Sequence, residues 1–168
     1  MNFGLLLARL VLGLLMAAHG SQKLFGWFGG HGISRTARFF ETLGFRPGRL
    51  FAVAAASAEL IGGLLVASGL LGPIGPALII AVMIVAAGSV HWRNGVFAGS
   101  NGVEVPLLYA TGAAALALTG PGAYSLDWLL GLAADWAPPM AWGALLLAIA
   151  GGAVNLALRR SAPAPTTP

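Results

Sequence analysis

The chain has 168 residues, of which 58% are hydrophobic and only 8% are charged. A soluble domain carries about 25% charged residues, so this composition excludes a water-covered globular protein and indicates a small polytopic membrane domain. The formal net charge of +4 does not indicate nucleic-acid binding, because the basic residues lie mainly in the connections between apolar segments. The chain has no Cys, which excludes disulfides and thiolate metal ligands.

Five apolar segments approach the length of about 20 residues that a helix needs to cross the hydrocarbon core of a bilayer. We expect them at about 3–27, 50–71, 74–97, 103–119 and 139–158. The first lacks the basic start and the cleavage site of a signal peptide, so it is predicted to stay as the first span. The sequence therefore predicts an all-α fold, a polytopic transmembrane helix bundle.

Two connections and the C-terminal end have recognisable features. Residues 28–49 combine glycines with a short amphipathic stretch, in which Ser34 is a predicted N-cap, and an interfacial helix is expected there. Residues 119–139 carry Tyr124 and two tryptophans, which suit the membrane–water boundary. Residues 161–168 are Pro-rich and are predicted to form a disordered tail.

The basic residues predict the orientation. With five spans, one side of the membrane receives the 28–49 connection, the 94–102 turn and the C-terminus, and it holds Arg35, Arg38, Arg46, Arg49, Arg93, Arg159 and Arg160. The 119–138 loop on the other side has only Asp127 and Asp135 as charged side chains. The positive-inside rule therefore places the basic side in the cytoplasm and the N-terminus outside.

Several ionisable side chains lie within the predicted spans, where each is costly and usually faces the interior of the bundle. The helical rise places His19, Lys23, Glu59 and His91 in the cytoplasmic half, with Glu104 at the start of the fourth span. His19 and Lys23 are four residues apart, so they are predicted to share a helix face. These groups are expected to form one intramembrane polar site.

A second pattern predicts close packing of the first two spans. Arg9, Gly13, Met16, Gly20 and Lys23 follow the spacing of one helix face, and glycines along such a face allow another helix to approach. Small residues also surround Glu59, so the charges are expected between these two helices. Arg9 and Glu59 are the predicted structural ion pair.

Each of these residues also has a simpler explanation. Lys23 could only extend to the lipid headgroups, and His91 could belong to an interfacial cluster with Trp92 and Arg93. His31, in a Gly-rich loop, is predicted to have no role. The sequence contains no Walker loop, dinucleotide-binding fingerprint, zinc-protease motif or nucleophile elbow, and no metal site is predicted.

Four stretches of the chain carry a resemblance to a known family: RLVLGLLMAAHGSQKLFGWFG, AELIGGLLVASGLLGP, VHWRNGVF and NGVEVPLLYATGAAALALTGPGAYSLD. Over about residues 3–130 the chain resembles the DoxX family of bacterial integral membrane proteins. Arg9, His19, Gly20, Lys23, Glu59, Gly62 and Gly63 lie where that family carries such residues. The resemblance implies a four-helix membrane domain over residues 1–130. The segment after Pro138 departs from that pattern, as a fifth span or an added hairpin element, and its apolar run predicts an additional C-terminal transmembrane helix within residues 131–160.

The resemblance also implies alternative functions. Members of the family resemble the small subunit of thiosulfate:quinone oxidoreductase, others are associated with oxidative-stress complexes, and distant relatives act as assembly factors. One hypothesis is a subunit of a quinone-linked oxidoreductase or oxidative-stress complex in the inner (plasma) membrane of a bacterium. The alternative is a non-catalytic membrane scaffold or assembly factor.

Under the first hypothesis His19, Lys23, Glu59 and His91 are the predicted catalytic residues, and quinone is the candidate cofactor. An imidazole and an ammonium can donate hydrogen bonds to quinone carbonyls, and a buried carboxylate can take up protons. Electrons would have to come from a cytoplasmic redox subunit, because the chain has no Cys and no recognisable haem or flavin motif. The other expected partners are the lipid bilayer and, as an open option, further copies of the chain.

Overall fold

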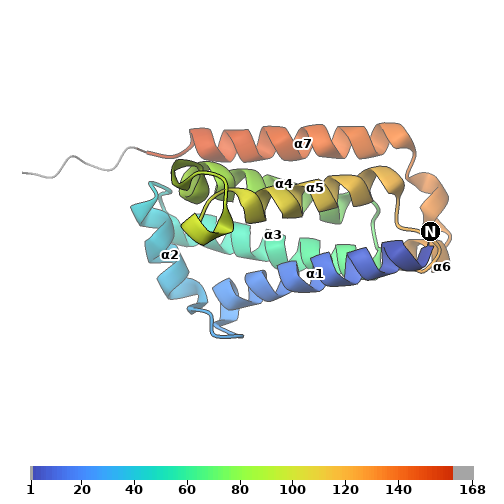
Figure 1. The fold of residues 1–168 in the computed structure, drawn as a ribbon, viewed down its shortest axis with the longest axis horizontal. Helices are drawn as coiled ribbons and strands as arrows, with labels where there is room; N and C mark the ends of the chain where they lie inside the picture. The colour runs from blue at the N-terminus through green and yellow to red at the C-terminus, as the bar shows by residue number, and fades with distance from the viewer. Residues whose placement is uncertain (1, 161–168) are drawn as a thin grey trace, which may run out of the picture.

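A computed structural model describes residues 2–160 as a bundle of helices that run side by side (Figure 1). The long helices are α1 (Asn2–Phe25), α3 (Gly48–Ser68), α4 (Ile74–Ala86), α5 (Glu104–Thr119) and α7 (Pro138–Ala157). Two shorter α-helices lie at opposite ends of the bundle, α2 (Gly32–Thr42) and α6 (Leu126–Leu129). The predicted tail at 161–168 lies outside the described residues.

The predicted all-α membrane bundle is confirmed. Four helical segments of 20 to 24 residues are long and apolar enough to cross a membrane: Asn2–Phe25, Gly48–Ser68, Ile74–Asn94 and Pro138–Ala157. The additional C-terminal helix expected from the sequence is α7. The predicted fourth span is the shorter α5, whose 16 residues rise by about 24 Å.

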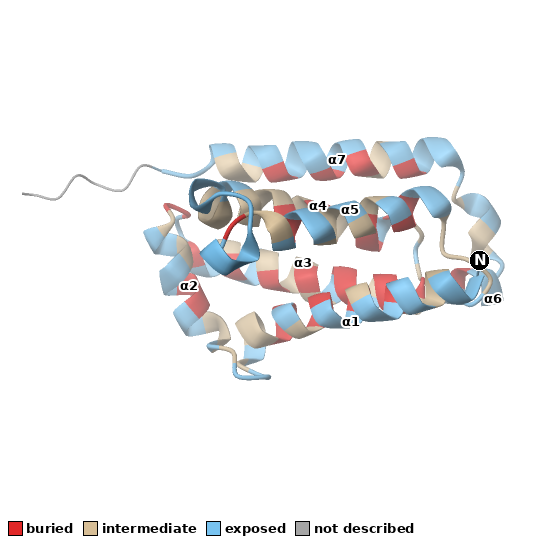
Figure 2. Cartoon of the chain, viewed as in Figure 1, coloured by how far each residue is buried: buried red, intermediate tan, exposed pale blue. Residues whose placement is uncertain are grey.

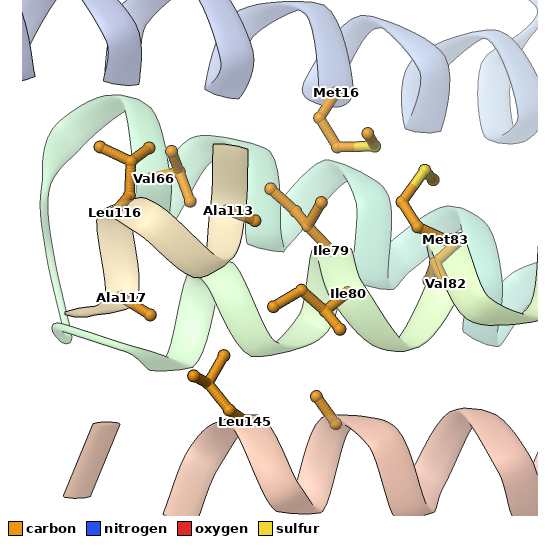
Figure 3. Packing of buried hydrophobic residues seen from close by; sticks show 11 residues of the cluster. Met16, Val66, Ile79, Ile80, Val82, Met83, Ala113, Leu116, Ala117 and Leu145 are labelled. Atoms are coloured by element: carbon orange, nitrogen blue, oxygen red, sulfur yellow. The ribbon is translucent and has the colours of Figure 1, made fainter. Parts of the chain in front are cut away.

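Helix α4 lies at the centre of the bundle, because it packs against α3, α5 and α7. The buried apolar cluster gathers around it (Figure 3) and consists of Met16, Val66, Ile79, Ile80, Val82, Met83, Ala113, Leu116, Ala117, Leu145 and Ala148. The outward faces of the helices are exposed (Figure 2) and still apolar, as Leu107, Leu146 and Leu147 illustrate. Such a surface suits contact with lipid.

The close packing predicted for the first two spans is confirmed. A Cβ atom at Gly13 would lie 2.5 Å from Gly63 O, and one at Gly20 would lie 2.5 Å from Leu60 N. These positions allow the backbones of α1 and α3 to come into contact. Met16, between the two glycines, is buried in the core.

Two local predictions need correction. Helix α2 begins at Gly32, after His31, and Ser34 lies inside the helix rather than at its N-cap. The N-cap therefore lies three residues earlier than expected, and the turn before it can form because Gly26, Gly29 and Gly32 all take positive φ angles. The third span leaves α-helical geometry after Ala86 and continues as a π-helical turn, Ala87–His91, and a 3₁₀ turn, Trp92–Asn94.

Candidate functional site: a cavity beside a buried ion pair

The charged centre of the bundle is an ion pair between α1 and α3. Lys23 Nζ donates to Glu59 Oε1. The side chain of Glu59 is 2% exposed and that of Lys23 is 34% exposed. The carboxylate therefore lies inside the bundle, and the ammonium lies nearer to the surface of the bundle. Glu59 Oε2 has no hydrogen-bond partner within residues 2–160. A buried acceptor without a partner costs free energy. The carboxylate of Glu59 therefore depends on its ion pair with Lys23 for stabilisation.

The predicted Arg9–Glu59 ion pair is wrong. The guanidinium of Arg9 lies next to Gly69, which is ten residues and about 15 Å along α3 from Glu59. Helices α1 and α3 run in opposite directions, so Lys23, at the other end of α1, is the cation that lies beside Glu59. The small residues do mark the face on which α1 and α3 pack. Which charged side chains form a pair depends on the position of each along its helix axis.

Arg9 instead stabilises the opposite end of the bundle. Its Nη1 donates to Pro121 O and its Nη2 to Tyr124 O. Nearby, both carboxylate oxygens of buried Asp127 accept backbone N–H groups of the α3–α4 turn, from Leu71 at 2.9 Å and from Gly72 at 2.7 Å. This network connects α1, the α3–α4 turn and the loop before α6, and its role is structural.

A cavity of about 530 Å³ lies at the α2 end of the bundle. Most of its lining is apolar, and it comes from α2, α3 and the end of the third span: Phe39, Phe40, Leu43, Ala55, Val82, Val85, Ala86 and Val90. The polar lining consists of Lys23, His31, Arg35, Thr36, Ser89 and His91. The volume and the mixture of an apolar wall with a few polar groups are typical of small-molecule sites.

The π-helical turn supplies three of these residues, Ser89, Val90 and His91. His91 Nδ1 lies 2.8 Å from the carbonyl oxygen of Asn101. A carbonyl only accepts, so Nδ1 donates, and in the neutral ring Nε2 is then left as an acceptor. Single π-helical turns within longer helices occur frequently at functional sites.

The structure brings together only part of the predicted site. Lys23 and His91 line the cavity and Glu59 lies directly behind Lys23, whereas His19 is exposed on another side of α1. Its ring meets Tyr109 on α5 edge-on, with the ring centroids 6.0 Å apart. His19 precedes Gly20 by one residue, which turns it by about 100° away from the face that packs on α3.

Glu104 does not join the site either. Its Oε2 accepts the backbone N–H of Ala98 at 2.6 Å and so holds the loop before α5.

Four polar residues of the cavity wall were not predicted from the sequence: His31, for which no role was expected, Arg35, Thr36 and Ser89. The first three line the cavity together with Phe39 and Phe40. A signal was present, because His31, Arg35 and Phe39 are spaced four residues apart, as are Thr36 and Phe40. Thr36 Oγ1 donates to Gly32 O within α2, at 2.9 Å, and to Lys23 O, at 3.4 Å; the second bond helps to hold α2 against the end of α1.

Comparison with known proteins supports the assignment of the fold to a family. No curated protein and no solved structure matches the chain. Residues 4–92 match DoxX. This range includes α1 from its third residue, all of α2, α3 and α4, both members of the ion pair and all the residues that line the cavity. The match covers more than half of the chain and, with its apolar spanning helices, identifies it as a multi-pass integral membrane protein of the DoxX family.

Proposed function

We propose that this protein is the membrane subunit of a quinone-linked oxidoreductase complex in a bacterial plasma membrane, and that its quinone site is the cavity at the α2 end. The observation that carries the proposal is the position of Lys23, which lines a largely apolar cavity while it is ion-paired with the buried Glu59. A polar donor at the wall of an apolar cavity is what an apolar ring with carbonyl oxygens requires.

The residues present fit a quinone head group. Phe39, Phe40 and Leu43 offer an apolar and aromatic surface for the ring. Lys23, Arg35 and Thr36 can donate hydrogen bonds to carbonyl oxygens. No Asp or Glu is among the residues that line this cavity, so no carboxylate in its wall would repel an electron-rich head.

The chemistry that a bound quinone supplies is the uptake of two electrons and two protons. Lys23 would orient the head through one carbonyl oxygen and could pass a proton to it, because the ammonium is a donor with three N–H groups. Glu59, buried behind Lys23, would hold the ammonium in place. Its Oε2, which has no hydrogen-bond partner within residues 2–160, could accept a proton from water and pass it to Lys23 to replace the one that Lys23 donates. His91, with one ring nitrogen fixed by Asn101 O, is the proposed second proton-transfer group.

The electrons are proposed to come from a cytoplasmic redox subunit that binds at the α2 end. The chain has no Cys, so an iron–sulfur cluster on thiolate ligands of this chain is excluded. Exposed basic residues surround the α2 end, among them Arg35, Arg38 and Arg46. An acidic surface on a partner would be steered toward them.

Quinone binding to the purified protein tests the proposal. Arg35→Gln and the double variant Lys23→Met/Glu59→Gln should weaken the binding of a short-chain benzoquinone by about tenfold or more, the loss expected for charge-assisted hydrogen bonds. Arg38→Gln is the matched control for Arg35→Gln, because Arg38 lies on α2 but not among the residues that line the cavity. His19→Gln is a second control outside the cavity.

The scaffold alternative gives the opposite result. A protein that only holds partners together should bind no quinone, or should bind it equally well in the cavity variants and the controls. Either result would overturn the quinone site and leave the fold assignment untouched.

A further inference from the structure

A second cavity lies beside the first. Its volume is about 250 Å³. Its lining is almost entirely apolar and comes from α2, α3, α4 and α7: Phe40, Phe51, Ala54, Ala55, Ala58, Ala81, Val82, Val85, Gly151, Gly152 and Asn155. Asn155 is the only residue in this wall with a polar side chain.

The two cavities adjoin and share one wall. Phe40, Ala55, Val82 and Val85 line both of them. The ionisable side chains among the lining residues all belong to the first cavity, and none of the residues that line the second cavity is ionisable. Polarity therefore changes from the first cavity, which has charged groups beside Lys23, to the second cavity, which lies beside α7 and is apolar.

Small residues create the second cavity. Helices α3 and α7 each pack against α4, and three alanines on α3 and two glycines on α7 leave the space between them unfilled. Gly152 packs directly on α4, because a Cβ atom there would lie 2.9 Å from Ile84 Cβ. Gly151, the next residue, has no atom within 4 Å of a Cβ position, and it is exposed as Ala54 is. The second cavity therefore opens on the apolar outer surface of the bundle, as a groove between α3 and α7.

The walls of this groove are held in position. Arg159 Nε donates to Leu43 O and Arg160 N donates to Gly44 O, both at 2.9 Å. The guanidinium of Arg159 also lies 5.7 Å from the centre of the Phe45 ring. The end of α7 is thus attached to the loop that follows α2, and the groove is a fixed part of the fold.

From this polar cavity beside an apolar one we infer that the ligand of this protein is an amphiphile with a long hydrocarbon tail, and that the groove between α3 and α7 binds the first part of that tail while the head lies beside Lys23. The inference rests on the proposed function, in which the head is a quinone. It assigns a role to α7, which lies outside the residues that match the family. The rest of the tail would continue into the lipid through the opening at Gly151.

Photo-crosslinking of the purified full-length protein tests the inference. Two benzoquinone probes with the same decyl tail are used, one with a diazirine on the first tail carbon and one with a diazirine at the tail end. Labelled peptides are mapped by mass spectrometry. We expect the first probe to label the residues around Lys23 and α2, and the second to label α7 near Gly151 and α3 near Ala54.

Gly151→Leu is the decisive variant, because Gly151 lines the groove and a Cβ atom there would have no atom within 4 Å, so a larger side chain can be added at the wall. It should lower labelling of α7 by the tail-end probe about tenfold, as a close-packed groove leaves no room for the chain. Labelling near Lys23 should stay unchanged. Gly143→Leu is the matched control on the same helix, because Gly143 also has open space at its Cβ position and is absent from the wall of either cavity.

The two probes separate the two hypotheses. If the first probe labels the head cavity while the tail-end probe does not label the groove, or does so equally in Gly151→Leu, the tail path is overturned and the quinone site stands. If the first probe does not label the cavity, the proposed function is overturned, and the tail path with it.

Discussion

At the scale of single residues, Lys23 and Glu59 depend on each other. Lys23→Met would leave a carboxylate in the interior without its cation, and loss of one member of a buried pair costs about 3–5 kcal/mol. The double variant Lys23→Met/Glu59→Gln should recover part of the lost stability, with a coupling energy of about 1–3 kcal/mol.

Thermal unfolding in detergent measures this cycle. The matched comparison is the cycle of Arg9→Ala and Glu59→Gln, since Arg9 donates to Pro121 O and Tyr124 O rather than to Glu59. Those two substitutions should be additive within about 0.5 kcal/mol. Coupling between Arg9 and Glu59 of the same size as that between Lys23 and Glu59 would contradict the pairing in the structure.

Asp127 gives a second prediction at this scale. Its two carboxylate oxygens each accept one backbone N–H of the α3–α4 turn. Asp127→Asn offers only one acceptor oxygen, so one buried N–H loses its partner, at a cost of about 1–3 kcal/mol in unfolding free energy. Asp135→Asn, at an exposed position in the same connection, should leave the melting temperature unchanged. Equal melting temperatures for the two variants would show that the carboxylate does not hold the turn.

The sequence could predict which ionisable residues matter at this scale, but only part of their pairing. Residue type and span position select Arg9, Lys23, Glu59 and His91, because buried charge is costly wherever it occurs. Their partners depend on the register between antiparallel helices, which a pattern on one helix does not contain. His19 directly precedes Gly20, which packs on α3, and the turn of about 100° between consecutive helical residues directs His19 toward Tyr109 on α5 instead.

At the scale of elements, the contact between α1 and α3 depends on glycine. A Cβ atom at Gly20 would lie 2.5 Å from Leu60 N and 2.6 Å from Ala56 O, so Gly20→Ala must push the two backbones apart. We expect a loss of about 1–3 kcal/mol, as for other overpacked sites.

Gly4→Ala is the control on the same helix, because its Cβ position has no atom within 4 Å. It should be neutral or more stable by up to about 1 kcal/mol, owing to the better helix propensity of Ala. Unfolding in detergent measures both variants. A stability for Gly20→Ala at or above that of the unsubstituted protein would contradict the close approach of α1 and α3.

Elements differ in how well the sequence predicts them. Long apolar runs with small residues predict the spans and the α1–α3 contact, because both depend on local spacing. Helix α2 was expected within residues 28–49, but its packing over the end of α1, which makes His31 and Arg35 part of the cavity, depends on glycine turns between the helices. The π-helical turn at Ala87–His91 was not predicted, because the shift in hydrogen bonding leaves no clear mark on hydropathy.

At the scale of the whole molecule, composition was sufficient for the fold class. A chain with 58% hydrophobic residues and few charges can bury its apolar surface only against itself and lipid, and helices satisfy their own backbone hydrogen bonds in that environment. The cavities could not be predicted in this way. The cavities are the spaces that the side chains of the five long helices and α2 leave unfilled, for instance beside Gly151. Their position depends on the packing angles of all these helices together.

The orientation of the whole molecule is the last prediction. In the structure, the first described residues lie at the α6 end and α7 finishes at the α2 end (Figure 1), as an odd number of spans requires. The basic residues gather at the α2 end, so the positive-inside rule places that end in the cytoplasm. A phosphatase reporter should therefore be active at the N-terminus, and a fluorescent protein should be fluorescent after Arg160.

Insertions within the chain make this test sharper. Gly99 and Gly131 are exposed and have open space around them, so reporters inserted there should leave the packing intact. We expect Gly99 to report the cytoplasm and Gly131 the outside, because α5 crosses the membrane between them. Helix α5 is the critical case, since its rise of about 24 Å is shorter than a typical hydrocarbon core of about 30 Å. If Gly99 and Gly131 report the same side, α5 does not cross; if they report opposite sides, the bilayer must thin locally to match it.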